Sequence, residues 1–105
     1  MSQIAVLSQF KAHHDEAGAL IAAFGPVLEL AREEPGTLLY ALHQSADNPD
    51  LFWVCELYAD HDAFALHRDS DAMAAATPAL AELIAESELI IGQPVSGKAL
   101  PGTSP

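Results

Sequence analysis

The sequence predicts an α+β fold, on three observations. Short runs rich in β-favouring residues occur at Ile4 to Phe10, Thr37 to Gln44, Leu51 to Tyr58 and Glu88 to Val95. Two longer stretches carry apolar residues at helical spacing. Their order is strand, helix, strand, strand, helix, strand. That order is the ferredoxin-like βαββαβ arrangement, made of two split βαβ halves.

The first helix follows the strand that begins at Ile4. Apolar residues recur every three or four positions from Glu16 to about Glu33, and Asp15 is a candidate cap. Pro26 removes a backbone donor inside this stretch, so we expect a kink or break near Phe24 and Gly25. The turn signature Glu34-Pro35-Gly36 ends the helix.

The second and third strands flank a polar turn over Ser45 to Asp50 and most simply form a hairpin. A pairing of Gln44 with the first residue of the third strand places Tyr40 and Trp53 on one face and Glu56 on the other. A slip of one residue would exchange the faces, so this register is provisional. Both faces are substantially apolar. One can pack on the helices, and we expect the sheet of a second copy to cover the other in a homodimer.

The third strand turns directly into a helix. Asp60 is well placed to cap a helix over Ala63 to Arg68, because a short carboxylate accepts a bond from an orphan backbone N–H. This joint is expected to bring Glu56 or Tyr58 near His67. A carboxylate, a phenol and an imidazole would then face one apolar space.

The last third of the chain predicts a longer helix and an edge strand. The helix spans Ala72 to Glu86 and can be capped from Asp69-Ser70-Asp71. We expect a break around Thr77, which would cap a final segment starting at Pro78. A glycine and a proline weaken the last strand into an edge element.

Composition limits the functional classes. Residues 1–95 are expected to form one domain, and 96–105, rich in Gly, Pro, Ser and Thr, a flexible tail. The net charge of −11 makes nucleic acid and anionic membrane surfaces poor partners. No signal peptide or bilayer-spanning apolar run is evident. A single cysteine, Cys55, fits a reducing compartment, and we expect the protein in the cytoplasm.

Three sequence blocks carry a resemblance to a known family. They are Glu34-Pro35-Gly36-Thr37-Leu38-Leu39-Tyr40, then Phe52-Trp53-Val54-Cys55-Glu56-Leu57-Tyr58, then Phe64-Ala65-Leu66-His67. In this order and spacing they resemble the antibiotic biosynthesis monooxygenase (ABM) domain, over Ile4 to about Val95. The resemblance implies a dimeric α+β barrel with a substrate cleft between sheet and helices. It also implies oxidation of phenolic or quinol substrates by molecular oxygen without metal or flavin.

The resemblance transfers to this chain only in part. Glu56 and His67 match the family's glutamate and helix histidine, whereas Tyr58 replaces the usual tryptophan. The haem-degrading relatives use an asparagine, a tryptophan and an iron-binding histidine, where this chain has Ser8, His67 and Thr77. Threonine is not an axial iron ligand, so haem degradation is disfavoured.

His67 is the candidate base or proton shuttle, because imidazole titrates near neutral pH. Tyr58 is expected to position the substrate oxygen. Glu56 either orients His67 or bonds a backbone group or an arginine. The candidate substrate-binding residues, each of which also has an ordinary core or dimer-interface interpretation, are Ser8, Phe10, Phe24, Trp53, Phe64 and Met73.

Other chemistries find little support. The His13-His14-Asp15 and His61-Asp62 runs lack further ligands at metal-binding spacing, so we predict no metal site. No glycine-rich phosphate loop is present, and we expect no cofactor.

The predicted function is therefore a cofactor-independent monooxygenase acting on an aromatic, quinol-type molecule. Two alternatives remain: a ligand-binding or stress-response dimer without catalysis, and an isomerase of a small polar signal. The isomerase would need basic groups for a phosphate, and only Arg32 and Arg68 are placed to help.

Overall fold

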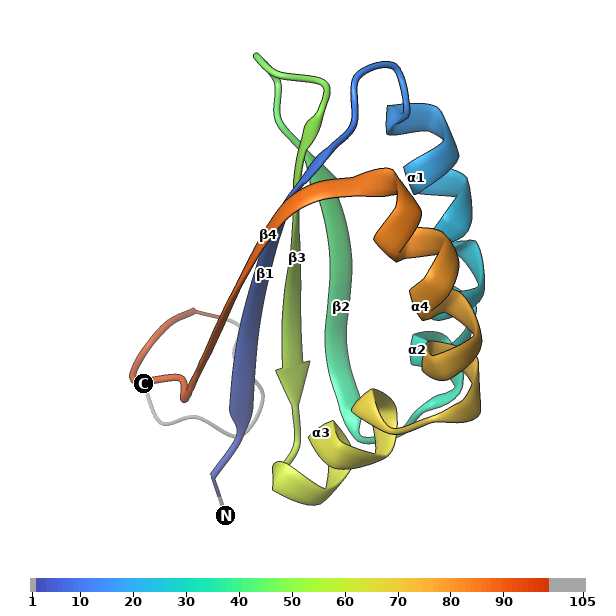
Figure 1. Ribbon diagram of the computed structural model, residues 1–105. Helices are drawn as coiled ribbons and strands as arrows, with labels where there is room; N and C mark the ends of the chain where they lie inside the picture. The colour runs from blue at the N-terminus through green and yellow to red at the C-terminus, as the bar shows by residue number, and fades with distance from the viewer. Residues whose placement is uncertain (1, 99–105) are drawn as a thin grey trace.

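In a computed structural model, residues 2–98 are described and form a four-stranded sheet covered on one face by helices (Figure 1). The elements in chain order are β1 (Ile4–Ala12), α1 (Ala17–Ala23), α2 (Gly25–Glu33), β2 (Thr37–Gln44), β3 (Leu51–Tyr58), α3 (His61–Arg68), α4 (Asp71–Leu83) and β4 (Ile84–Gly92). The predicted ferredoxin-like α+β fold is confirmed. Of the predicted tail, residues 99–105 lie outside the described part.

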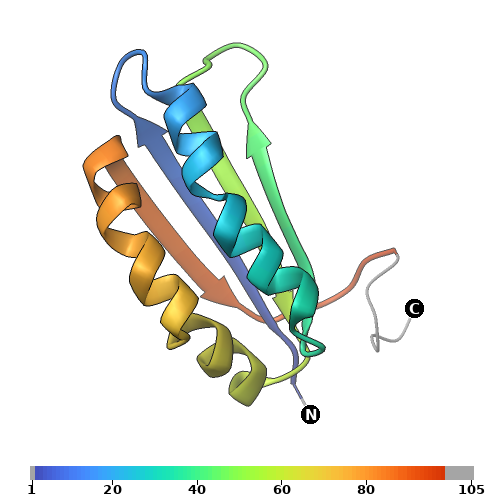
Figure 2. The same cartoon turned by 90° about the vertical axis from the view of Figure 1, so that its right-hand side faces the viewer.

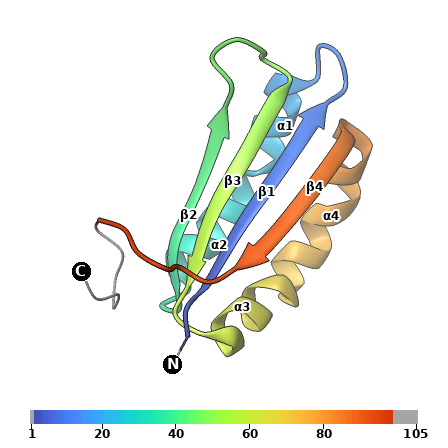
Figure 3. The same cartoon turned by 90° about the vertical axis from the view of Figure 1, so that its left-hand side faces the viewer.

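The sheet has the strand order β2-β3-β1-β4, and all neighbouring strands are antiparallel. The helices lie on one side of it (Figure 2), and the opposite side is bare of helices (Figure 3). The sheet of one chain is open, with β2 and β4 at its edges. The edge position predicted for the last strand is therefore confirmed, although that strand begins and ends earlier than expected.

The predicted break in the first helix is confirmed. α1 ends at Ala23, Phe24 joins the two segments, and Pro26 lies in the first turn of α2, where no backbone donor is needed. The two helices run almost end to end (Figure 2). The proposed cap was wrong: Asp15 has a positive φ of 65°, and the capping position belongs to Glu16, whose side chain makes no capping bond.

The predicted break in the second long helix was also wrong. α4 is continuous through Pro78, and the Thr77 hydroxyl donates to the Met73 carbonyl at 2.7 Å instead of capping a new segment. Pro78 has no N–H to donate to the carbonyl of Ala74, four residues earlier. Both residues are exposed, so this carbonyl lies on the solvent side of α4, where a helix tolerates proline best. The helix begins with Ser70 as its cap, whose hydroxyl accepts from the Met73 N–H.

The hairpin register differs from the expected one by one residue. Gln44 pairs with Phe52, and Tyr40 therefore pairs with Glu56 on the helix-covered face. The turn is the cause: the Ser45 N–H donates to the Leu51 carbonyl at 2.9 Å, which takes the first residue of β3 into the closing pair. The expected placement of Tyr40 on the face opposite Glu56 was wrong.

An aromatic cluster joins the sheet to the first helix pair. The ring of Phe10 on β1 stacks against Phe24 at a centroid distance of 5.3 Å and against Phe52 on β3 at 5.8 Å. All three side chains are buried. Burial of each such ring stabilises the fold by roughly 1.5–3 kcal/mol, so this cluster fixes the helix layer over one end of the sheet.

Candidate active site

A cavity of about 400 Å³ lies between the sheet and the helices α3 and α4. Its wall is mostly apolar, and it includes five of the six predicted substrate-binding residues: Ser8, Phe10, Phe24, Phe64 and Met73. The sixth, Trp53, is not in this wall. It lies on the opposite face of the sheet, where its ring stacks on His43 at 5.5 Å.

The sheet supplies the floor of the cavity in cross-strand rows. Tyr40 on β2 pairs with Glu56 on β3, and Glu56 pairs with Val6 on β1. Val6 in turn pairs with Ile91 on β4. The polar residues of this row therefore lie toward β2, while its β4 end is apolar and, at Ile91, 52% exposed.

His67 enters the cavity from α3, and local bonds fix its helix. The Asp60 carboxylate accepts from the Ala63 N–H at 2.8 Å, which confirms the predicted cap. At the other end of the helix, the Ser70 hydroxyl donates to the His67 carbonyl at 2.8 Å. These two contacts hold both ends of a short helix whose imidazole is only 3% exposed.

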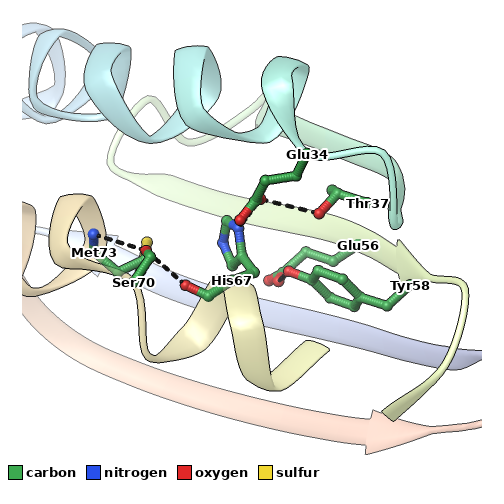
Figure 4. A network of polar contacts seen from close by, with 7 residues as sticks. All are labelled: Glu34, Thr37, Glu56, Tyr58, His67, Ser70 and Met73. Atoms are coloured by element: carbon green, nitrogen blue, oxygen red, sulfur yellow. Dashed lines mark hydrogen bonds and ion pairs between the residues drawn. The ribbon is translucent and has the colours of Figure 1, made fainter. Parts of the chain in front are cut away.

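The partner of His67 is Glu34 (Figure 4). The Nδ1 atom of His67 lies 2.6 Å from Oε1 of Glu34, and the Thr37 hydroxyl donates to the same oxygen at 3.0 Å. A carboxylate only accepts, so Nδ1 carries a proton that it donates to Glu34. The buried Nε2 atom has no hydrogen-bond partner among the described residues.

Gly36 allows this contact to form. A Cβ atom at position 36 would come within 2.6 Å of the Ala63 Cβ, so only glycine lets the turn before β2 approach α3 this closely. The Gly36 carbonyl also accepts from the Ala59 N–H at 2.9 Å. The turn that carries Glu34 is thus packed directly against the helix that carries His67.

Glu56 and Tyr58 form a second polar pair. The Tyr58 hydroxyl donates to Oε1 of Glu56 (Figure 4). Burial raises the pKa of the Glu56 carboxyl above its ordinary value, and the Tyr58 hydrogen bond and the nearby His67 only partly offset this. Burial and the charge of Glu56 raise the pKa of Tyr58, which therefore stays protonated. Tyr58 is fully buried, and it contacts the cavity through Glu56 rather than lining it.

Tyr40 completes the polar end of the cavity. Its ring centroid lies 5.1 Å from the ring centroid of His67, and the ring centroid of Tyr58 lies 5.5 Å from that of His67. Burial, followed by the charges of Glu56 and Glu34, raises the pKa of the Tyr40 phenol. Tyr40 is thus a neutral hydroxyl in a cavity wall that also carries a carboxyl and an imidazole.

Sequence reasoning missed two members of this group. Tyr40 was expected on the other face because of the register error. Glu34 was treated only as part of a turn, and its 33-residue separation from His67 gave no local signal. The Glu34-Pro35-Gly36 run was the available clue, since a turn at the start of β2 brings its side chains to the end of the sheet where α3 begins.

A second groove, of about 740 Å³, lies between the end of α2 and the helices α3 and α4. Its lining is acidic, with Glu33, Glu34, Asp62, Asp69 and Asp71. Such a groove repels phenolates and other anions. The smaller apolar cavity with converging polar groups is therefore the candidate site.

Within residues 2–98, no group of three or more His, Cys, Asp or Glu side chains is arranged to hold a metal ion. His14 lies near Asp15 and Asp50 at 3.4 and 3.9 Å, but its side chain is 88% exposed. In the same part of the chain, no helix has the length and apolarity needed to cross a membrane.

Comparison with known proteins gives one family match and several structural matches. The model of the family described as antibiotic biosynthesis monooxygenase matches residues 3–79, which is more than half of the chain. No curated protein matches the sequence at a significant level.

Three solved structures illustrate the structural similarity. A protein from Caulobacter crescentus, described as a putative antibiotic biosynthesis monooxygenase, is 27% identical with a TM-score of 0.84, covering 90% of this chain and 92% of its own. A Mycobacterium tuberculosis protein is 25% identical with a TM-score of 0.85 and coverages of 93% and 100%. A Shewanella oneidensis protein is 26% identical, with a TM-score of 0.83 and coverages of 89% and 91%.

Proposed function

Because the chain belongs to the antibiotic biosynthesis monooxygenase family, we propose that it is a small monooxygenase that oxidises an aromatic, phenol- or quinol-type molecule with molecular oxygen. The observation that carries the proposal is the buried Nε2 atom of His67. It has no protein partner within residues 2–98, and it belongs to a wall residue of an apolar cavity. The Glu34 carboxylate on the other ring nitrogen fixes its orientation.

In the proposed reaction, His67 is the base. Nε2 takes an acidic proton from the bound substrate, and the Glu34 carboxylate stabilises the imidazolium that forms. The resulting phenolate or carbanion is electron-rich enough to pass electrons to oxygen. For a substrate with a methylene between two aromatic rings, the balance is R₂CH₂ + O₂ → R₂C=O + H₂O. One oxygen atom enters the product and the other leaves as water, so the substrate supplies all four electrons.

The cavity supports an aromatic substrate by size and lining. A volume of about 400 Å³ lies within the usual range for small-molecule sites. The rings of Phe10, Phe24 and Phe64 line it, so a flat polycycle finds apolar contact on several sides. The neutral Tyr40 hydroxyl at the polar end is available to a substrate oxygen.

Oxygen consumption tests the proposal directly. We expect turnover with members of a panel of hydroquinones and polycyclic phenols, and a loss of about 100-fold or more in kcat for His67→Ala. His14→Ala removes an exposed imidazole and serves as the matched control, with activity unchanged. An absence of oxygen uptake across the panel contradicts the proposal. Calorimetric binding of the same compounds without turnover would instead favour the ligand-binding alternative.

A further inference from the structure

Arg68 is the one permanent cation among the described residues of the cavity wall. It is the last residue of α3, and its side chain is 52% exposed, so it lies at the solvent rim of the cavity. The other three cations of the chain, Lys11, Arg32 and Lys98, do not line this cavity. The positive charge at the rim is therefore a local feature of a chain whose net charge is −11.

Two contacts hold the guanidinium of Arg68 against the cavity wall. Its central carbon lies 5.3 Å from the ring centroid of Phe64, which is itself a wall residue. The Asp69 carboxylate accepts from Nε at 2.9 Å and from Nη2 at 3.0 Å. Because the ring face attracts the cation and the carboxylate fixes its plane, Arg68 has little freedom left to lose when a ligand binds.

The contact with Asp69 leaves most of the guanidinium available. A guanidinium has five N–H donors, and Asp69 takes two of them. The other three, two on Nη1 and one on Nη2, have no hydrogen-bond partner within residues 2–98. An exposed ion pair contributes little to stability, so a ligand carboxylate can bind beside Asp69 or compete with it.

Arg68 lies on the side of the cavity that opens toward β4. The ring below it, Phe64, packs in one buried cluster with Val6. Val6 in turn pairs with Ile91 of β4, which is 52% exposed. The phenol of Tyr40 belongs to β2, at the other edge of the sheet. A flat aromatic molecule with a hydroxyl toward Tyr40 would thus have its opposite end near the guanidinium.

We propose that Arg68 determines substrate specificity by binding a carboxylate on the end of the aromatic substrate that lies opposite its phenolic hydroxyl. The inference rests on the proposed monooxygenase function, because the same cavity holds the substrate. It adds an acidic substituent to the substrate class and gives Arg68 a binding role that the reaction itself does not require. A guanidinium suits this role, because its planar fork matches a carboxylate through two parallel hydrogen bonds.

Ligand binding under nitrogen tests the proposal without turnover. One probe is a naphthol that carries a carboxylate on the ring opposite its hydroxyl, and the other has a carboxamide in the same position. Calorimetric titration of the full-length protein gives both Kd values. We expect the wild type to bind the carboxylate about tenfold more tightly, which is the size of a charge-assisted contact at a partly exposed site. High salt should reduce this preference, because it screens exposed charges.

Arg68→Gln should abolish the preference and leave the Kd of the carboxamide unchanged. Arg32→Gln is the matched control, because it removes the same charge from an exposed site in the last turn of α2, outside the cavity wall. We expect this control to keep the wild-type preference. Equal Kd values for the two probes in the wild type would overturn the proposal. So would an equal loss of preference in both variants, which would assign the effect to net charge.

Arg68→Glu gives a second, independent test at the same exposed position. The variant places a negative charge at the rim, so the carboxamide should become the tighter ligand. Its circular dichroism should match that of the wild type, because the side chain at this site is not part of the core. A folded Arg68→Glu variant that still prefers the carboxylate contradicts the assignment of specificity to this residue.

Oxygen uptake with the same two naphthols separates this inference from the proposed function. Uptake by a wild type that binds both probes equally well overturns the role of Arg68 and leaves the monooxygenase proposal standing. A carboxylate preference that disappears in Arg68→Gln, without oxygen uptake by the wild type, supports the inference and contradicts oxidation of these compounds.

Discussion

The imidazole of His67 and the carboxylate of Glu34 meet at 2.6 Å between Nδ1 and Oε1, although one lies on α3 and the other ends α2. Both side chains are largely buried, with 3% and 11% of their surface exposed. Neither element could form this pair alone. The contact requires the β2–β3 hairpin, which carries the chain away from Glu34 and back to the same end of the sheet.

Glu34→Gln should lower activity while the fold is kept. The amide retains the side-chain volume but loses the charge that stabilises a protonated His67, so we expect kcat to fall about tenfold or more with little change in KM. Steady-state oxygen uptake measures both constants. Glu33→Gln, one residue away and exposed, is the control. Equal kcat values for the wild type and Glu34→Gln would show that Glu34 does not act through His67.

Gly36→Ala should weaken both stability and activity. The new Cβ would lie 2.6 Å from the Ala63 Cβ, so the turn and α3 must move apart, at a cost of about 1–3 kcal/mol. Urea unfolding measures the stability and oxygen uptake the activity. Gly18→Ala in α1 meets no atom within 4 Å and should be stabilising by about 0.5–1 kcal/mol, because alanine favours helices. Equal stability of the wild type and Gly36→Ala would contradict the packing argument.

Glu56 should make the free energy of unfolding depend on pH. Its folded-state pKa is raised above 4.5, mainly by burial and despite the opposing effects of Tyr58 and His67. A raised pKa stabilises the fold fully below the unfolded-state value, and that contribution is lost as pH rises through the folded-state value. The stability of wild type relative to Glu56→Gln should therefore fall from about pH 4.5 upward, by at most about 1.4 kcal/mol per pH unit. Urea unfolding from pH 4 to 7 checks this, and a constant difference would contradict it.

The bare sheet face should pair with a second copy of the chain. Leu39 is 46% exposed on this face, which also carries the His43–Trp53 stack, and exposed apolar surface favours association. We expect light scattering to give the mass of two chains, and Leu39→Glu to give the mass of one. Leu66→Glu, at a 67% exposed site on α3, should leave the mass unchanged. A wild-type monomer would contradict this assembly.

Features set by neighbouring residues were predictable from the sequence. The break before Pro26 depends on short-range sterics, and the Asp60 cap depends on a hydrogen bond across three residues. The continuous helix through Pro78 was not predictable in this way, because it depends on which side of α4 faces solvent.

The site was harder to predict because tertiary contacts assemble it. A one-residue change in the Ser45–Asp50 turn decides whether Tyr40 joins the cavity, and propensity does not fix that register. Likewise, nothing local to Glu34 identifies His67 as its partner. The sequence located one imidazole and one carboxyl of the site, and the three-dimensional packing supplied the residues that orient them.

The cross-strand row from Tyr40 to Ile91 makes the two ends of the cavity unequal. Its β2 end carries Tyr40 and Glu56 with His67 beside them, while its β4 end is apolar and half-exposed at Leu89 and Ile91. A substrate must enter with its reacting ring first, and substituents at its opposite end extend past β4 into solvent. Selectivity should consequently be strict for the leading ring and permissive for bulky trailing substituents, so that one such enzyme can serve a set of decorated aromatic compounds.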